Sequence, residues 1–118
     1  MDEARLDELD YAYLTTTGRV SGEPREIEIW FALAGGTVYF LAGGGRRANW
    51  VRNIVADPRV SLRIGERTWP GTGRVVDDPA EDALARRALL AKYERRYGGD
   101  LGGWGRTALP VAVERAGG

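Results

Sequence analysis

Apolar and polar residues alternate along several short stretches of the 118-residue chain, which is the pattern of β-strands buried on one face. The alternation is cleanest over residues 25–33, where isoleucine, phenylalanine and leucine occupy every second position. Residues 59–64 alternate in the same way. The turn formers Gly35-Gly36 and Gly65-Glu66 follow these two stretches, so each is expected to continue into a hairpin.

The pattern predicts six strands in all. They are expected over residues 11–17, 25–33, 37–42, 59–64, 67–76 and 108–114. Hairpins dominate and there is no regular strand-helix-strand order, which argues against a doubly wound parallel sheet. The predicted fold class is mainly β with helical insertions, built as a small, largely antiparallel barrel.

Helices are expected at three places along the chain, over residues 2–10, 46–56 and 78–97. The third has the clearest start, because Asp78 suits the N-cap, Pro79 the first helical position and Glu81 a capping box. Residues 98–106, around Trp104, are expected to form a glycine-rich loop. The whole chain, 1–118, is predicted to be one domain, in which residues 1–11 form a helix that covers an edge of the barrel.

The composition excludes several kinds of chemistry. The sequence has no histidine and no cysteine, so it cannot form a usual zinc site, a Ser-His-Asp triad or a cysteine nucleophile. We therefore predict no metal site and no catalytic side chain: either a bound cofactor carries the chemistry, or the protein is not an enzyme. No apolar run approaches the ~20 residues that span a bilayer, and the acidic N-terminus does not resemble a signal peptide, so a cytoplasmic location is expected.

The charges balance overall but are distributed unevenly. Lys and Arg number 17 and Asp and Glu number 17, and this zero net charge argues against general nucleic-acid binding. Residues 46–63 are nevertheless basic, with five arginines against Asp57 alone. A local basic region on a neutral protein favours a small anionic ligand.

Two glycine-rich loops are the candidate anion sites. Gly43, Gly44 and Gly45 follow a predicted strand and precede Arg46 and Arg47 at the expected start of a helix. Glycine backbone and a helix N-terminus both favour close approach of an anion. Residues 17–25 form the second loop, and two such loops favour one elongated anionic ligand over two flexible loops with solvated arginines.

Three segments carry a resemblance to a known family. Residues 14–25 read LTTTGR-x-SG-x-PR, residues 50–60 read W-x-x-N-x-x-A-x-P-x-V, and residues 106–111 read RTALPV. Their order and spacing resemble the deazaflavin-dependent nitroreductase family, over about residues 13–113. The resemblance implies a split β-barrel related to FMN-binding oxidoreductases. It also implies coenzyme F420, a 5-deazaflavin with a phospholactyl-oligoglutamate tail, and hydride transfer to a quinone, a nitroaromatic compound or another small electrophile.

The resemblance also implies roles for individual residues. Arg19, Ser21, Gly22 and Arg25 would hold the phosphate and glutamate tail. The glycines 43–45 would let the backbone lie against the cofactor, Trp50 would pack near the deazaflavin, and Asn53 would fix the helix or the ligand. The sequence departs from the family at Val20, Ala42 and Asn49, and its glycine turn is shorter, so the nitroreductase activity is less secure than the fold.

Four aromatic residues are candidates for the acceptor site, with ordinary core packing as the alternative for each: Trp30, Tyr93, Tyr97 and Trp104. Three other functions remain open. The barrel would suit FMN in place of F420, a non-catalytic carrier of a flavin, deazaflavin, haem-like or lipid ligand, or a purely structural partner. A haem is disfavoured by the lack of histidine and cysteine. The sequence leaves open whether the protein is a monomer or a homodimer.

Overall fold

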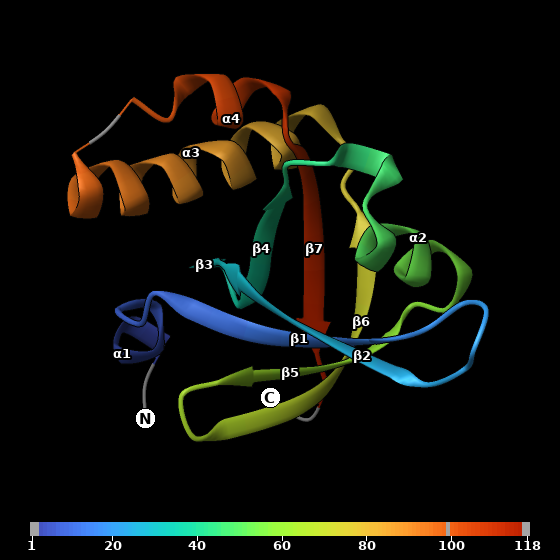
Figure 1. Cartoon of the computed structure of the whole chain (residues 1–118). Helices are drawn as coiled ribbons and strands as arrows, with labels where there is room; N and C mark the ends of the chain where they lie inside the picture. Colours follow the sequence, from blue (N-terminus) through green and yellow to red (C-terminus); the bar gives the residue numbers. More distant parts are fainter. Residues whose placement is uncertain (1–2, 99, 117–118) are drawn as a thin grey trace.

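In the part of the chain that the structure describes, one antiparallel sheet of seven strands forms the frame. The computed structural model describes residues 3–98 and 100–116. The strands are β1 (Tyr11–Thr17), β2 (Pro24–Trp30), β3 (Ala32–Ala34), β4 (Thr37–Ala42), β5 (Arg59–Ile64), β6 (Arg67–Val75) and β7 (Leu109–Arg115). They follow the order β2-β1-β5-β6-β7-β4-β3. Because β2 and β3 are consecutive in the chain yet lie at opposite ends of this order, the sheet curls into a half-barrel (Figure 1). The predicted split-barrel class is confirmed.

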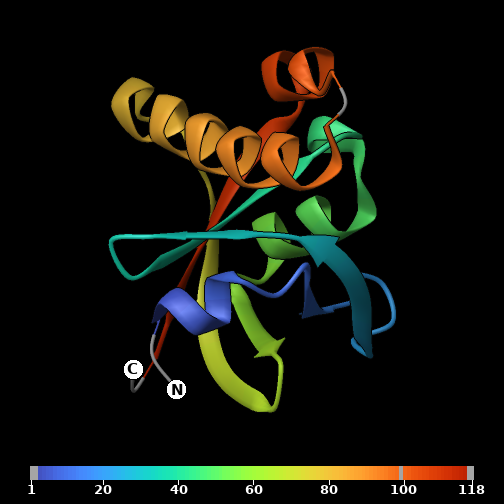
Figure 2. The same cartoon turned by 90° about the vertical axis from the view of Figure 1, so that its left-hand side faces the viewer.

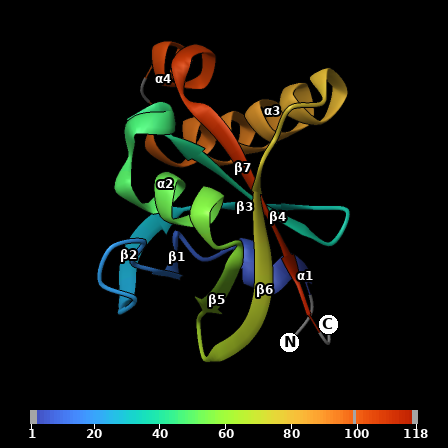
Figure 3. The ribbon, with the colours of Figure 1, turned by 90° about the vertical axis from the view of Figure 1, so that its right-hand side faces the viewer.

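The helices lie at the ends and on one outer face of the sheet. They are α1 (Glu3–Asp7), the 3-10 helix η1 (Gly45–Arg47), α2 (Asn49–Ala56), α3 (Pro79–Tyr97) and α4 (Gly102–Thr107). Helix α3 crosses β3, β4 and β7, with α4 beside it (Figure 2). Helix α2 lies against β1 and β6 on the other side (Figure 3). None of the helices in the described part of the chain has the length and apolar character needed to span a membrane.

Two apolar cores explain which strands are buried. The first fills the inside of the half-barrel, and the second lies between the sheet and α3. Strand β4 contributes to both, because Val38 and Phe40 face the barrel interior while Tyr39 and Leu41 face α3. Alternating side chains of a strand point to opposite faces, so a strand covered on both sides is apolar throughout.

The strand expected over 25–33 is two strands, which raises the count from six to seven. Side-chain alternation does continue through the break, since Phe31 packs in the barrel core while Trp30 and Ala32 pack toward α3. The backbone of Phe31, however, pairs with α3: its N–H donates to Tyr93 Oη at 2.9 Å, and its carbonyl accepts from Lys92 Nζ at 2.9 Å. The chain leaves one end of the sheet at this residue and joins the other end.

Two helices differ from expectation in their boundaries. Helix α1 ends at Asp7, so Leu6 is buried but Leu9 is 38% exposed; residue 2 of the expected helix lies outside the described residues. The helix expected over 46–56 is interrupted at Ala48, whose ψ of 136° separates η1 from α2. Arg46 and Arg47 therefore belong to η1 and not to the first turn of α2.

The glycine-rich segment that was expected to be a loop instead contains helix α4. Gly99, which belongs to this segment, lies outside the described residues. Two contacts explain the helix. Asp100 Oδ1 accepts the N–H of Gly102 at 2.9 Å, and Gly105 lies so close to α3 that a Cβ there would be 2.6 Å from Leu90 Cδ1. Glycine at position 105 allows α3 and α4 to pack closely. The low helix propensity of glycine gives no sign of this packing.

Helix α3 begins and ends at the predicted residues, but the Glu81 carboxylate, expected to complete a capping box, accepts from Arg74 and Tyr39 instead. Asp78 is the N-cap and its carboxylate accepts the N–H of Glu81 at 2.9 Å, with Pro79 in the first turn. Gly98 terminates the helix with a φ of 64°, a left-handed conformation that favours glycine. Local capping signals therefore fixed both ends of the longest helix.

We predict that Tyr93→Phe lowers the free energy of unfolding by about 1–3 kcal/mol, because the buried N–H of Phe31 would lose its acceptor. Chemical denaturation measures the change. Tyr97→Phe is the matched control, since the Tyr97 hydroxyl donates to Asp10 at an exposed position. Equal losses for the two variants would contradict the account of the Phe31 break.

Candidate functional site

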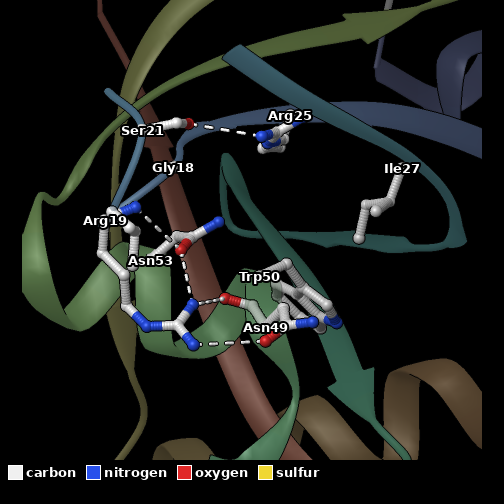
Figure 4. A pocket seen from close by; sticks show the side chains of 9 residues that line it. Gly18, Arg19, Ser21, Arg25, Ile27, Asn49, Trp50 and Asn53 are labelled. Atoms are coloured by element: carbon white, nitrogen blue, oxygen red, sulfur yellow. Dashed lines mark hydrogen bonds between the residues drawn. The ribbon is translucent and has the colours of Figure 1, made fainter. Parts of the chain in front are cut away.

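A cleft of about 330 Å³ lies between the β1–β2 loop, strand β2 and helix α2. Its lining residues are Gly18, Arg19, Val20, Ser21, Arg25, Ile27, Asn49, Trp50 and Asn53. Figure 4 shows Arg25 and Ser21 on one side of this basic cleft, Ile27 and Trp50 on another, and Arg19 with Asn53 opposite. Five of the residues predicted to bind the cofactor thus line one cleft: Arg19, Ser21, Arg25, Trp50 and Asn53.

Asn53 holds Arg19 in place at the cleft. The Asn53 side chain is 4% exposed, and its Oδ1 accepts from Arg19 Nη1 at 2.8 Å and from the Arg19 backbone N–H at 3.2 Å. Its amide nitrogen donates to Thr16 Oγ1 at 3.1 Å, and Asn49 Oδ1 accepts a further bond from Arg19 at 3.2 Å. All these partners are neutral, so Arg19 is oriented while its positive charge stays uncompensated.

The β1–β2 loop presents Arg25 to the same cleft. Ser21 Oγ accepts from Arg25 Nη2 at 3.3 Å and from the Glu23 N–H at 3.1 Å. The loop is closed at its base by the bond from the Gly18 N–H to the Glu23 carbonyl at 2.8 Å, and a Cβ at Gly18 would lie 2.8 Å from Ser21 Oγ. Gly22 has a φ of 74° and shapes the loop without lining the cleft.

The arginines around the cleft differ from most other cations of the molecule. Ion pairs with carboxylates are made by Arg59, Arg74, Arg86, Lys92, Arg96 and Arg115. Within residues 3–98 and 100–116 no carboxylate pairs with Arg19, Arg25, Arg46, Arg47 or Arg52. The alternative that Arg19 and Arg25 bridge to nearby glutamates is therefore not realised. A donor set of unpaired guanidinium groups suits phosphate and carboxylate.

A second depression of about 330 Å³ adjoins the basic cleft and shares Arg19 with it. Arg46, Arg52, Val55 and Ala56 complete its lining. Arg52 was not among the predicted site residues, although it belongs to the basic stretch of the sequence. The glycines 43–45 and Arg47 lie outside both linings.

Trp50 both packs in the core and lines the cleft. Its ring meets Phe40 edge to face, with centroids 6.2 Å apart and an interplanar angle of 73°. Trp50 is also part of the cleft wall. The two interpretations of Trp50, core residue and cofactor wall, are therefore compatible.

The four predicted acceptor residues form one aromatic cluster. Trp30 stacks on Tyr93 with centroids 4.1 Å apart and on Tyr97 at 5.3 Å, and Trp104 meets Trp30 edge to face at 5.6 Å. An aromatic cleft of about 440 Å³ opens beside the cluster. Its lining is Tyr11, Glu28, Ile29, Trp30, Leu41, Leu101 and Trp104. Tyr93 is fully buried behind Trp30.

Tyr11 is a lining residue of the aromatic cleft that the sequence analysis missed. It is the register partner of Trp30 in the β1–β2 pair. The hairpin pairing of residues 11–17 with 25–33 would have placed Tyr11 beside Trp30, had the register been worked out from the loop between the two strands.

Strand β2 connects the basic cleft with the aromatic cleft. Ile27 lines the basic cleft and Ile29 lines the aromatic one. Residues two apart on a strand point the same way and are about 7 Å apart. The two clefts therefore share β2 as part of their walls, with Ile27 and Ile29 on the same face of that strand.

Ionisable groups beside the aromatic cluster are perturbed. Hydrogen bonds from Tyr97 and Arg96 hold the pKa of the Asp10 carboxyl below its ordinary value, and the same bond to Asp10 raises the pKa of Tyr97. Burial raises the pKa of Tyr93 and lowers that of Lys92 to about 8. At neutral pH the tyrosine hydroxyls therefore stay protonated.

Comparisons with known proteins agree with this arrangement. The profile of the F420H(2)-dependent quinone reductase family matches residues 3–116, so the chain belongs to that family. Among solved structures, an F420-H2 dependent reductase, FDR-A, is similar with a TM-score of 0.69 and 22% identity, over 88% of this chain and 92% of that one. A conserved hypothetical protein from Mycobacterium tuberculosis, Rv2991, gives 0.75 and 18%, over 98% and 81%.

The same fold also occurs in proteins with other roles. HutZ, described as a heme storage protein from Vibrio cholerae, is similar with a TM-score of 0.73 and 17% identity, over 98% of this chain and 88% of that chain. The fold alone therefore does not decide the ligand. Family membership decides the ligand, because it shows that the protein is an oxidoreductase that uses coenzyme F420. The unpaired arginines and the tight loop at Gly18 fit the anionic part of that cofactor.

We predict that Asn53→Asp weakens F420 binding about tenfold, which corresponds to about 1.4 kcal/mol, because a carboxylate in this position would neutralise Arg19. Quenching of F420 fluorescence measures the affinity. Ser61→Asp on β5 adds the same charge outside the cleft and is the control. Unchanged affinity in Asn53→Asp, with the fold retained, would show that Arg19 does not face the cofactor.

Proposed function

We propose that the protein transfers a hydride from reduced F420, bound along the basic cleft, to a flat, apolar acceptor of the quinone type in the aromatic cleft. The observation that carries the proposal is that β2 forms part of the wall of both clefts, one lined by unpaired arginines and the other by aromatic rings. Nitro and enone compounds are acceptors of the same electronic class, and the test below includes them.

In this proposal the cofactor tail is held by arginine. Arg19 and Arg25 face the basic cleft from two sides and offer their positive charge and remaining N–H donors to the phosphate. Arg46 and Arg52 continue the positive charge beyond Arg19, where the glutamate carboxylates of the tail would follow. The two depressions share Arg19, so the positive charge extends from one into the other.

The reduced deazaflavin supplies the hydride when it is bound. The chain's contribution is to orient the two reactants and to exclude water. Ile27 and Trp50 give the basic cleft an apolar wall, and Trp30 and Trp104 offer ring faces and edges to a planar acceptor. Tyr11 is the hydroxyl in the lining of the aromatic cleft, and we assign it as the hydrogen-bond donor to the acceptor oxygen as charge develops there. Tyr93 supports Trp30 from behind.

FMN is the alternative cofactor that the sequence left open, and its single phosphate would also suit Arg19 and Arg25. The arginines beyond Arg19 favour the longer anionic tail of F420. A carrier function would use the basic cleft in the same way but would leave the aromatic cleft without a role. That the protein forms a homodimer stays a prediction, which a measurement of its oligomeric state in solution will test.

We predict that the protein binds F420 more tightly than FMN, and that Arg25→Ala reduces F420 affinity at least tenfold and flattens its dependence on salt. Parallel fluorescence titrations at low and high ionic strength make the measurement. Arg95→Ala, which removes an exposed arginine of α3, is the matched control. Binding of neither cofactor, or an Arg25→Ala variant that binds F420 like the parent, would refute the tail assignment.

We predict that Trp104→Leu raises the KM for a naphthoquinone by about fivefold to tenfold while the Kd for F420 is unchanged, because the variant removes one aromatic wall of the acceptor cleft. Steady-state assays with a naphthoquinone, a nitroaromatic compound and an enone define the acceptor class. Thr107→Ala, on the exposed end of α4, controls for disturbance of the helix. A change in Kd without a change in KM would place the acceptor elsewhere.

A further inference from the structure

Lys92, the single lysine of the chain, is buried inside the molecule. Its side chain is 3% exposed, and its Nζ lies 2.8 Å from the Leu9 carbonyl, 2.9 Å from the Phe31 carbonyl and 3.4 Å from Asp7 Oδ1. The ammonium also lies 3.7 Å from the centroid of the Phe31 ring. A protonated lysine has three N–H donors, and here each one has an oxygen to meet.

Lys92 contacts Phe31, the one residue that separates β2 from β3. The carbonyl of Phe31 accepts from Lys92 at 2.9 Å. The Tyr93 hydroxyl accepts the Phe31 N–H, and its single proton is shared between the Asp10 carbonyl at 2.7 Å and the Phe31 carbonyl at 3.0 Å. Two neighbouring side chains of α3 therefore replace the sheet partner that Phe31 lacks. A backbone group at this depth that loses its partner is costly, so these bonds fix the path of the chain.

The path at Phe31 sets the position of the acceptor wall. Trp30 precedes Phe31 directly and stacks on Tyr93, with an interplanar angle of 4°. On its other side Trp30 lines the aromatic cleft and meets Trp104. A shift of the Phe31 carbonyl toward or away from α3 therefore tilts Trp30 within the cleft.

We infer that Lys92 is a positioning residue for the acceptor cleft, which it shapes by holding the Phe31 backbone in its protonated state. The inference rests on the proposed function, since it assigns the aromatic cleft to the acceptor. It concerns a side chain that touches neither the cofactor nor the acceptor. Lys92 acts through Phe31 and Trp30.

The surroundings make Lys92 a group that titrates within the working range. Burial lowers its pKa to about 8, while the Asp7 and Asp10 carboxylates oppose that shift and the Arg96 guanidinium adds to it. Tyr93 and Tyr97 face the same region and stay neutral there. Above about pH 8 the neutral amine keeps two N–H donors for three oxygens, so one contact is lost.

The test measures two independent properties between pH 6.5 and 9. The first is the near-UV circular dichroism of the cofactor-free protein, taken as the difference between the parent and Trp30→Phe. The second is the acceptor KM for menadione at saturating reduced F420. We expect both to change with one midpoint near pH 8, with KM rising about fivefold as one hydrogen bond is lost, while the Kd for F420 stays constant.

Two variants and a control make the result specific to Lys92. Asp7→Asn keeps the oxygen that accepts the Leu33 N–H at 3.0 Å but removes the charge, so the midpoint should move down by about one pH unit. Lys92→Met should abolish the transition, while Arg95→Met, an exposed cation of the same helix, should leave it in place. If Lys92→Met fails to fold, the shift of the midpoint in Asp7→Asn alone still tests the role of Lys92.

The outcomes separate this inference from the proposed function. A Trp30 signal that is flat across this pH range, or a midpoint that Asp7→Asn does not move, would overturn the role of Lys92 whatever the acceptor is. If no quinone is reduced but the Trp30 signal titrates as expected in the parent and in Asp7→Asn, Lys92 positions Trp30, and the acceptor assignment of the cleft is wrong.

Discussion

At Phe31 the polypeptide passes from one end of the curled sheet to the other, and its backbone has to be satisfied there without a strand partner. Helix α3 meets this need with Tyr93 and Lys92. The same face of α3 also holds the N-terminal segment, since Arg96 and Tyr97 bond to Asp10. Three features depend on this attachment: the position of the edge strand β2, the stacking of Trp30 on Tyr93, and the closure of the half-barrel. The helix is therefore part of the site as well as a cover for the core.

The two clefts differ in the way that their residues are prepared for a ligand. In the basic cleft Arg19 is fixed by neutral amide partners, so orientation is gained without loss of charge. In the aromatic cleft Trp30 is fixed by stacking on a buried tyrosine. Both arrangements are preorganised, which lowers the entropy lost on binding. One strand, β2, sets the distance between them.

Much of the fold could be predicted from periodicity and capping, and the rest depended on contacts between distant segments. Alternation over 25–33 is continuous because Phe31 keeps its side-chain direction, so the pattern holds no sign that its backbone changes partner. Glycine content concealed α4, whose Gly105 packs on Leu90. The motif around Arg19 and Arg25 located the basic cleft, but Arg52 meets Arg19 in the adjoining depression only through the packing of α2.

Binding of F420 compared with a deazaflavin nucleoside that lacks the phospholactyl-glutamate tail tests the central claim most directly. The claim is that unpaired arginines select the cofactor through its anionic tail. Titration at two ionic strengths should give at least a hundredfold tighter binding of F420, with the advantage shrinking as salt is added. Equal affinities for the two compounds, independent of salt, would contradict the claim and leave the arginines without a role in cofactor binding.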